Sequence, residues 1–266
     1  MACLPRQVNL YSVNMRCYYR TMTISPKTAS ARATTVKAAP RKPAPSRTPV
    51  KAKNSAKPAR KAAASAPYHH GDLPGVLLKA AESLLESGGL PGLTLRAVAR
   101  EAGVSHAAPT HHFGDLTGLL SELAAVGFQR FHAHAEAAQE RAATPAAAVL
   151  ARAGAYLSFA RTWPGMFTLM FRTDRLDMTR PALRNAADAA FGGLAASVGA
   201  RGPGDPATAP LTLAQAAQIA RAWSVVHGFS MLLLDGRLND MLRRLPVGTT
   251  PEMLFAEMLT AHIHKP

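Results

Sequence analysis

Residues 93–109 read LTLRAVAREAGVSHAAP, and this stretch decides the fold. Apolar side chains recur at helical spacing over its first half, with Thr94 placed to cap the helix N-terminus. Gly103 follows, where a tight turn favours a residue that tolerates a positive φ. Ser105 can then cap a second short helix that reaches His111. Two short helices joined by a glycine-containing turn are typical of a helix-turn-helix, whose second helix enters the DNA major groove, although helical bundles also contain such corners.

The sequence on both sides of this stretch predicts more helices and therefore an all-α fold. Apolar residues at spacings of three and four between Val76 and Leu85 predict a helix that ends at Gly88-Gly89. Together with the two short helices, this helix would form a three-helix unit. Further helices are expected at about residues 115–141, 145–161, 181–198, 211–237 and 253–263.

The identities of the residues carry more information than their periodicity. YHHGDL at residues 68–73, the stretch quoted above, and then His112-Phe113 and Leu119 resemble the N-terminal domain of the TetR family of transcriptional regulators. The resemblance implies a three-helix DNA-binding domain over residues 68–120, with Ser105–His111 as the recognition helix. The residues that it places near DNA are Thr94, Arg96, Ser105, His106, Ala107, Thr110 and His111.

Three positions depart from the family pattern. Thr110 stands where the family usually has an aromatic residue, and His111, largely neutral at pH 7, stands where its relatives are often basic. Leu116 and Thr117 replace the usual lysine or arginine at the start of the next helix. Each change removes a phosphate contact, so we expect this domain alone to bind DNA weakly.

Residues 1–67 differ in composition from the rest of the chain. They contain 14 Lys or Arg and no acidic residue, whereas residues 68–266 contain 17 Lys or Arg against 16 acidic residues. A segment rich in Ala, Lys and Pro cannot bury enough apolar surface to offset its ordering entropy, so a disordered arm is expected. Its spaced cations would attract DNA non-specifically and compensate for the missing phosphate contacts. An inert solubilising tail, a targeting segment and a misassigned start are the alternatives.

Residues 121–266 are expected to bind an effector and to form a homodimer. The helix at about 211–237 is apolar on two faces, so one face can pack on its own subunit and the other on a partner. With residues 253–263, this helix predicts a symmetric four-helix seam. Such a dimer would place its two recognition helices about one DNA turn apart.

The C-terminal part also resembles the TetR family, more loosely. Trp223-x-x-x-His227-Gly228, then LLLDGRL at residues 232–238, with PGMFTLMF at 164–171 upstream, look like the regulatory domain of one TetR branch. The resemblance implies that each subunit binds a small, mostly apolar effector.

Methionine and aromatic side chains are the candidate effector contacts. Methionine adapts to irregular shapes, and Trp and His add polar atoms to an apolar pocket. The same pattern is also typical of an ordinary core, and His227 fits a hydrogen-bonded core histidine equally well. The candidates are Phe159, Met166, Phe167, Met170, Phe171, Trp223 and His227.

Several functional classes are disfavoured by what the sequence lacks. No run approaches the roughly 18 apolar residues of a membrane span. Cys3 and Cys17 are the only cysteines and lie in the arm, so the body has no disulfide framework or thiolate metal site. Histidine pairs such as His132 and His134 lack ligand spacing, because residues two apart lie on opposite sides of a helix. We therefore expect no metal site, no cofactor and no enzyme activity.

These patterns predict a ligand-responsive, dimeric transcriptional regulator. The interpretation is a cytoplasmic, nucleoid-associated bacterial repressor that a small apolar effector releases from a double-stranded DNA operator. The alternative is a nucleoid-type architectural protein that binds DNA non-specifically through the arm. A helical enzyme is a third class, and it lacks paired carboxylates or a nucleophile–base spacing.

Overall fold

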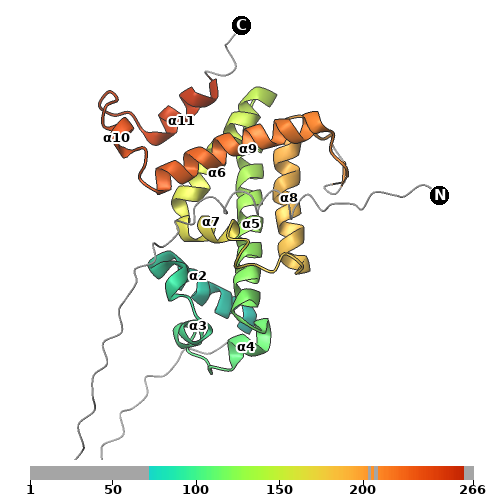
Figure 1. Cartoon of the computed structure of the whole chain (residues 1–266), viewed down its shortest axis with the longest axis vertical. Helices are drawn as coiled ribbons and strands as arrows, with labels where there is room; N and C mark the ends of the chain where they lie inside the picture. The colour runs from blue at the N-terminus through green and yellow to red at the C-terminus, as the bar shows by residue number, and fades with distance from the viewer. Residues whose placement is uncertain (1–71, 203–204, 207–208, 261–266) are drawn as a thin grey trace, which may run out of the picture. The chain divides into compact units, whose positions relative to one another are not determined.

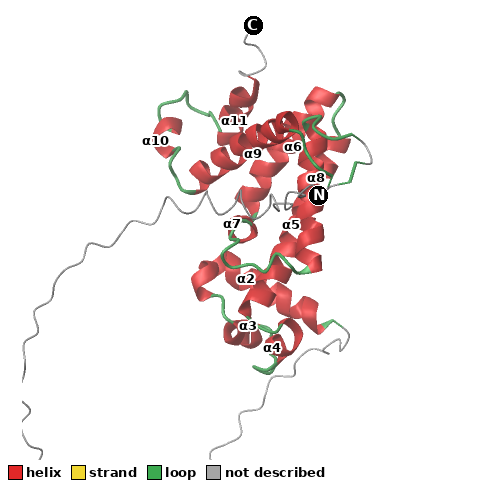
Figure 2. Ribbon diagram, turned by 45° about the vertical axis from the view of Figure 1, so that its right-hand side comes forward, coloured by secondary structure: helices red, strands yellow, loops and turns green. Residues whose placement is uncertain are grey.

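The computed structural model describes residues 72–202, 205–206 and 209–260. Every regular element in these ranges is a helix, which confirms the predicted all-α fold (Figure 2). The arm expected at residues 1–67 lies outside the described residues.

Three helices form the N-terminal unit: α2 (Leu73–Gly92), α3 (Leu95–Glu101) and α4 (Ala108–Phe113). The Asp72 carboxylate caps α2 by accepting a 3.0 Å hydrogen bond from the Gly75 N–H. α2 kinks at Gly89, whose φ of 66° is a conformation that favours glycine. Helical geometry is thus interrupted at Gly89, where the sequence predicted the helix end, and α2 includes a short further turn beyond this kink.

The long helix α5 (Leu116–Glu140) runs through the centre of the chain (Figure 1). It packs on α2 and α4 of the N-terminal unit and on α6 (Pro145–Thr162), α7 (Pro164–Met170) and α8 (Pro181–Ser197). One core of buried side chains extends across these helices, so the N-terminal unit and the C-terminal helices share a hydrophobic core.

Two glycines on α5 permit close approach of other elements. A Cβ atom at Gly127 would lie 2.8 Å from the Met166 Sδ, so α7 can lie directly against α5 only because this side chain is absent. A Cβ atom at Gly118 would lie 2.0 Å from the Phe113 carbonyl oxygen. α5 thus contacts both α7 and the end of α4 at short range.

The chain ends in α9 (Leu213–Leu234), α10 (Asn239–Leu242) and α11 (Pro251–Thr260). Thr212 and Gln215 form a reciprocal capping box at the start of α9. Phe229 of α9 packs on Phe255 of α11, with 4.8 Å between the ring centroids. The short helix α10 was not predicted from the sequence.

Candidate DNA interface and effector domain

The first helix of the helix-turn-helix follows the sequence prediction closely. The Thr94 hydroxyl accepts a 3.1 Å hydrogen bond from the Ala97 N–H and caps α3. Gly103 has a φ of 68°, and the next N–H, from Val104, donates to the Ala99 carbonyl oxygen at 2.9 Å. The predicted cap and glycine turn are confirmed.

The recognition helix begins later than predicted. It spans Ala108–Phe113, not Ser105–His111, and Ser105 is not its cap. The Ser105 carbonyl oxygen instead accepts the Ala108 N–H at 3.1 Å and closes a turn before the helix. Pro109 is in the first turn of the helix, where its missing N–H costs no internal hydrogen bond and its fixed φ is favourable. The proline, and not the serine, therefore sets the position of the helix start.

Burial separates the two sides of this unit. Val98, Ala99, Pro109 and Phe113 are buried and hold α3 and α4 against the core. The side chains predicted to contact DNA are all exposed, and they lie at the cap of α3, on α3, on α4 or in the turn between the two helices: Thr94, Arg96, Ser105, His106, Ala107, Thr110 and His111.

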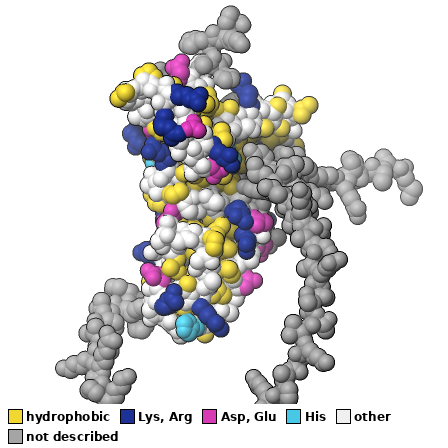
Figure 3. Space-filling view, turned by 60° about the vertical axis from the view of Figure 1, so that its left-hand side comes forward, with side chains coloured by type: hydrophobic (Ala, Val, Ile, Leu, Met, Phe, Trp, Pro, Cys, Tyr) yellow, Lys and Arg dark blue, Asp and Glu magenta, His cyan; other side chains and the backbone are white. Residues whose placement is uncertain are grey.

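Cations and histidines gather on the exposed side. Figure 3 shows Lys or Arg and His side chains together at the end of the body that α3 and α4 form. Arg96 and Arg100 are exposed and pair with no acid within the described part of the chain. His112, which the sequence analysis did not select, is also exposed, and its ring lies 5.2 Å from that of His111. The sequence could have indicated His112 as a DNA contact, because it directly follows the predicted contact His111.

Leu116, which stands where the family usually has a lysine or arginine, has a packing role in the structure. Leu116 is half-buried and packs on the hydrophobic core at the first turn of α5. A residue in this setting contributes to packing rather than to phosphate binding, which leaves Arg96 and Arg100 on α3 as the exposed cations of the helix-turn-helix.

Polar contacts connect the N-terminal unit to the helices that follow it. The Glu86 carboxylate on α2 accepts the N–H groups of Gly165 and Met166 at the start of α7, at 3.0 and 2.8 Å. Glu82 on α2 forms a two-pronged ion pair with Arg130 on α5, and this hydrogen bonding raises the pKa of Arg130. Residues with these roles are far apart in the sequence, which gave no signal of their pairing.

Four of the candidate effector contacts form one aromatic cluster. The His227 ring lies 4.6 Å from Phe171 and 5.6 Å from Phe167, and Trp223 lies 6.1 Å from Phe171. Tyr156, which the sequence analysis did not select as an effector contact, completes the cluster, with its hydroxyl 2.8 Å from the His227 Nδ1. Burial lowers the pKa of His227 to about 4, so the ring is neutral at pH 7 and accepts from or donates to this hydroxyl without charge.

The other candidates lie next to this cluster and are fully enclosed. Phe159 contacts Phe131 and Trp163, with centroids 5.5 and 5.1 Å away. Met166 and Met170 lie against the gap that Gly127 leaves on α5. These three side chains are at most 2% exposed, whereas Phe171, Trp223 and His227 are half-buried. Access to the cluster is therefore greatest on the side of α9.

Apolar side chains are exposed on the last long helices. Leu213 and Leu232 of α9 are 87% and 46% exposed, and Met253 of α11 is 57% exposed. They lie in the segments predicted to form the dimer seam.

Two further findings concern the described residues as a set. No three His, Cys, Asp or Glu side chains among them are arranged to hold a metal ion. None of their helices combines the length and the apolar character that a membrane crossing requires.

Comparison with known proteins agrees with this architecture. Residues 77–123 match a family model described as bacterial regulatory proteins, tetR family, and residues 149–261 match one described as tetracyclin repressor-like, C-terminal domain. No curated protein sequence matches the chain.

Solved structures with the same fold extend over most of the chain. A protein of unknown function from Rhodococcus sp. RHA1 is 35% identical, with a TM-score of 0.57, over 74% of this chain and 96% of that one. A protein described as a tetR family transcription regulator, from Shewanella sp. PV-4, is 17% identical, with a TM-score of 0.50, over 71% of this chain and 96% of that one. With both family models matched in order, this chain belongs to the TetR family of transcriptional regulators.

Proposed function

We propose that the protein is a homodimeric repressor that binds operator DNA through α3 and α4 and leaves it when a small molecule binds the C-terminal helices. The observation that carries the proposal is the exposed, unpaired cationic and histidine surface of the helix-turn-helix. DNA recognition combines phosphate contacts with base readout. Guanidinium groups without an acidic partner can supply the phosphate contacts, and the short exposed helix beside them can supply the base readout.

The division of roles follows from the side chains. Arg96 and Arg100 on α3 contact phosphates and position the unit on the duplex. His106, Thr110 and His111 supply donors and acceptors to base edges in the major groove. These three side chains contribute little charge to the base contacts, so affinity for any one operator depends on both halves of a dimer.

The exposed apolar side chains support the dimer. Leu213, Leu232 and Met253 would be costly to leave in water, and a second copy packed on α9 and α11 would cover them. A two-fold axis along this seam gives two recognition helices, as a palindromic operator requires.

The effector acts by linkage between two sites. A ligand that enters beside Phe171, Trp223 and His227 favours a conformation in which the recognition helices no longer match adjacent grooves. A hundredfold loss of operator affinity needs a coupling free energy of about 2.7 kcal/mol. The contacts of Glu86 with α7 give this coupling a direct route to the N-terminal unit.

The test is binding of the purified protein to the intergenic DNA beside its own gene, compared with scrambled DNA at physiological salt. We expect a preference of at least about tenfold for the native fragment. His106→Ala should reduce that preference, while Arg141→Ala, at the exposed C-terminal end of α5, should not. Equal affinity for both fragments would contradict the proposal. It would instead support the alternative of an architectural protein that binds DNA non-specifically, which the family membership does not favour.

A further inference from the structure

Histidines concentrate on the exposed side of the helix-turn-helix. His106 lies in the turn before α4, and His111 and His112 lie in the last turn of α4. All three residues are exposed, and the rings of His111 and His112 are 5.2 Å apart. Three of the ten histidines in the chain are therefore on the surface that we propose to contact DNA.

Histidine differs from the other cations of this surface in its response to pH. Its charge ordinarily changes between about pH 5 and 8, whereas the guanidinium groups of Arg96 and Arg100 stay charged throughout this range. A neutral imidazole has one N–H donor, and an imidazolium has two donors and a positive charge. The surface can therefore gain charge, and contacts to DNA, as the pH falls.

The charged groups on the elements packed against α4 leave the two rings in its last turn without an acidic partner. Glu101 of α3 is exposed, and within the described residues it is beyond ion-pair distance of any histidine. The carboxylates of α2 and of the start of α5 bind other groups in the protein: Asp72, Glu82, Glu86, Asp115 and Glu122. The cations on these elements and at the end of α4 are Lys79, Arg96, Arg100 and Arg180. An anion that pairs with His111 and His112 therefore has to come from outside the subunit.

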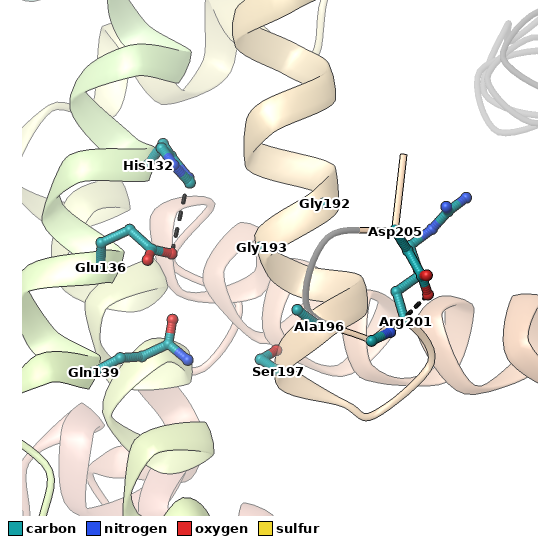
Figure 4. A pocket seen from close by; sticks show the side chains of 10 residues that line it. His132, Glu136, Gln139, Gly192, Gly193, Ala196, Ser197, Arg201 and Asp205 are labelled. Atoms are coloured by element: carbon teal, nitrogen blue, oxygen red, sulfur yellow. Dashed lines mark hydrogen bonds and ion pairs between the residues drawn. The ribbon is translucent and has the colours of Figure 1, made fainter. Parts of the chain in front are cut away.

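A histidine elsewhere in the chain provides the contrast. His132 of α5 lies 4.0 Å from the carboxylate of Glu136, beside the pocket between α5 and α8 (Figure 4). Glu136 also accepts a 2.8 Å hydrogen bond from the buried Arg152, which lies between it and Gly193 of α8. Among the described residues, His132 is the histidine that has a carboxylate at ion-pair distance. A positive charge on His132 thus has a partner inside the protein, whereas a charge on α4 has none until an anion binds.

The two rings of α4 also oppose each other's protonation in the free protein. Positive charges on rings 5.2 Å apart repel, so the second proton binds less readily than the first. A DNA phosphate beside the pair offsets this repulsion, because an opposite charge within about 4–6 Å favours the charged form. Binding of DNA and binding of protons therefore favour each other.

We propose that His111 and His112 bind DNA as imidazolium cations, so that the protein takes up protons when it binds DNA and its affinity for DNA rises as the pH falls. His112 contacts phosphate, and His111 donates from its ring nitrogens to acceptors on the DNA. This inference rests on the proposed DNA-binding function. It adds His112 to the interface and makes the charge of the recognition helix adjustable near neutral pH.

Fluorescence anisotropy with the full-length protein tests the inference, with native and scrambled DNA at about pH 6, 7 and 8 and at several salt concentrations. We expect affinity for both fragments to rise at least about tenfold from pH 8 to pH 6, because each proton taken up changes log affinity by up to about one per pH unit. The slope of log affinity against log salt should also steepen at low pH, by about 0.9 for each added phosphate contact. The pKa of His227, lowered by burial to about 4, keeps that side chain neutral over this range.

Substitutions of the pair assign the effect. The double substitution His111→Gln with His112→Gln should leave less than about a threefold rise between pH 8 and pH 6. His111→Lys with His112→Lys should bind more tightly than the glutamine protein at pH 8 and depend little on pH, because lysine stays charged. His132→Gln is the matched control and should keep the full dependence of the wild type. The other histidines titrate in every protein, so the difference between wild type and variant reports on the pair.

Two results would overturn the inference: equal wild-type affinity at pH 6 and pH 8, or an equal rise in the wild type and the glutamine protein. The comparison of native with scrambled DNA keeps this test separate from that of the proposed function. A preference for native DNA without pH dependence would refute the protonation alone. A pH dependence that requires the two histidines, without sequence preference, would refute the operator-specific repressor alone. Failure to bind either fragment would refute both.

Discussion

The guanidinium group of Arg180 donates a 2.9 Å hydrogen bond to the carbonyl oxygen of Phe113. Phe113 is the last residue of α4, and Arg180 precedes the first residue of α8. A second nitrogen of Arg180 pairs with Glu122 on α5 at 2.9 Å. The end of the recognition helix is therefore tied to two helices of the C-terminal part through one side chain.

Removal of this contact should loosen the recognition helix. Arg180→Met leaves the Phe113 carbonyl and Glu122 without their partner, so the free energy of unfolding should fall by about 1–3 kcal/mol. Urea unfolding measures this change. Arg175→Met is the control, because Arg175 is exposed and its ion pair with Asp174 is a surface pair worth little. Equal effects of the two substitutions would show that the Arg180 contact has no special role.

The two arginines of α3 should act on affinity and not on sequence preference. Arg100→Ala should weaken binding to native and scrambled DNA alike, and should lower the slope of log affinity against log salt by about one for each bound subunit. His106→Ala should instead reduce the preference for the native fragment. Fluorescence anisotropy at several salt concentrations separates the two effects. An unchanged salt slope in Arg100→Ala would show that this side chain does not contact phosphate.

Deletion of residues 1–67 tests the role assigned to the basic arm. The 14 cations of this segment should contribute non-specific attraction, so the deletion should lower affinity for all DNA and flatten the salt dependence. The ratio of native to scrambled affinity should remain. If affinity and salt slope are both unchanged, the arm is an inert tail.

The proposed dimer seam can be tested with a charge on each of its helices. Leu232→Glu and Met253→Glu should each convert the dimer to a monomer, because a carboxylate buried without a partner is strongly unfavourable. Sedimentation equilibrium reports the mass, and operator affinity should fall with the dimer. Val149→Glu, at an exposed apolar position on α6, should remain dimeric.

His227 should make stability depend on pH. Its pKa is about 4 in the folded protein and near 6.5 in the unfolded chain, so the unfolded state binds more protons between these values. The stability that a neutral His227 contributes is therefore complete above about pH 6.5 and is lost as the pH falls toward 4. The loss should be on the order of 3 kcal/mol at most.

The measurement is urea unfolding across this pH range, with His227→Gln for comparison. Carboxylates also titrate in the lower part of the range, so the difference between the two proteins is the quantity that reports on His227. Parallel curves for the wild type and His227→Gln would contradict a buried, neutral histidine.

The first helix and the turn of the helix-turn-helix could be predicted from the sequence, because they depend on interactions between residues close together in the chain. Thr94 caps α3 and Gly103 takes the left-handed conformation because each needs only its immediate neighbours to do so. Local preferences alone gave the wrong start for α4. Ser105 and Pro109 both favour a helix start, and the helix begins next to Pro109. Helical periodicity likewise located α5, α6, α8 and α9 to within a few residues at each end.

Contacts between distant residues were decided by the tertiary structure alone. Nothing in the sequence pairs Arg180 with Phe113, or places Arg152 of α6 between Glu136 and Gly193. Such contacts depend on how closely two helices approach, and that distance is set by the packing of the whole core, including glycines such as Gly127. The sequence therefore determined which segments are helical and which family they belong to. Only the packed structure decided how the recognition helix is tied to α8 and how Arg152 comes to pair with Glu136, because both depend on atoms that the chain brings together only when it folds.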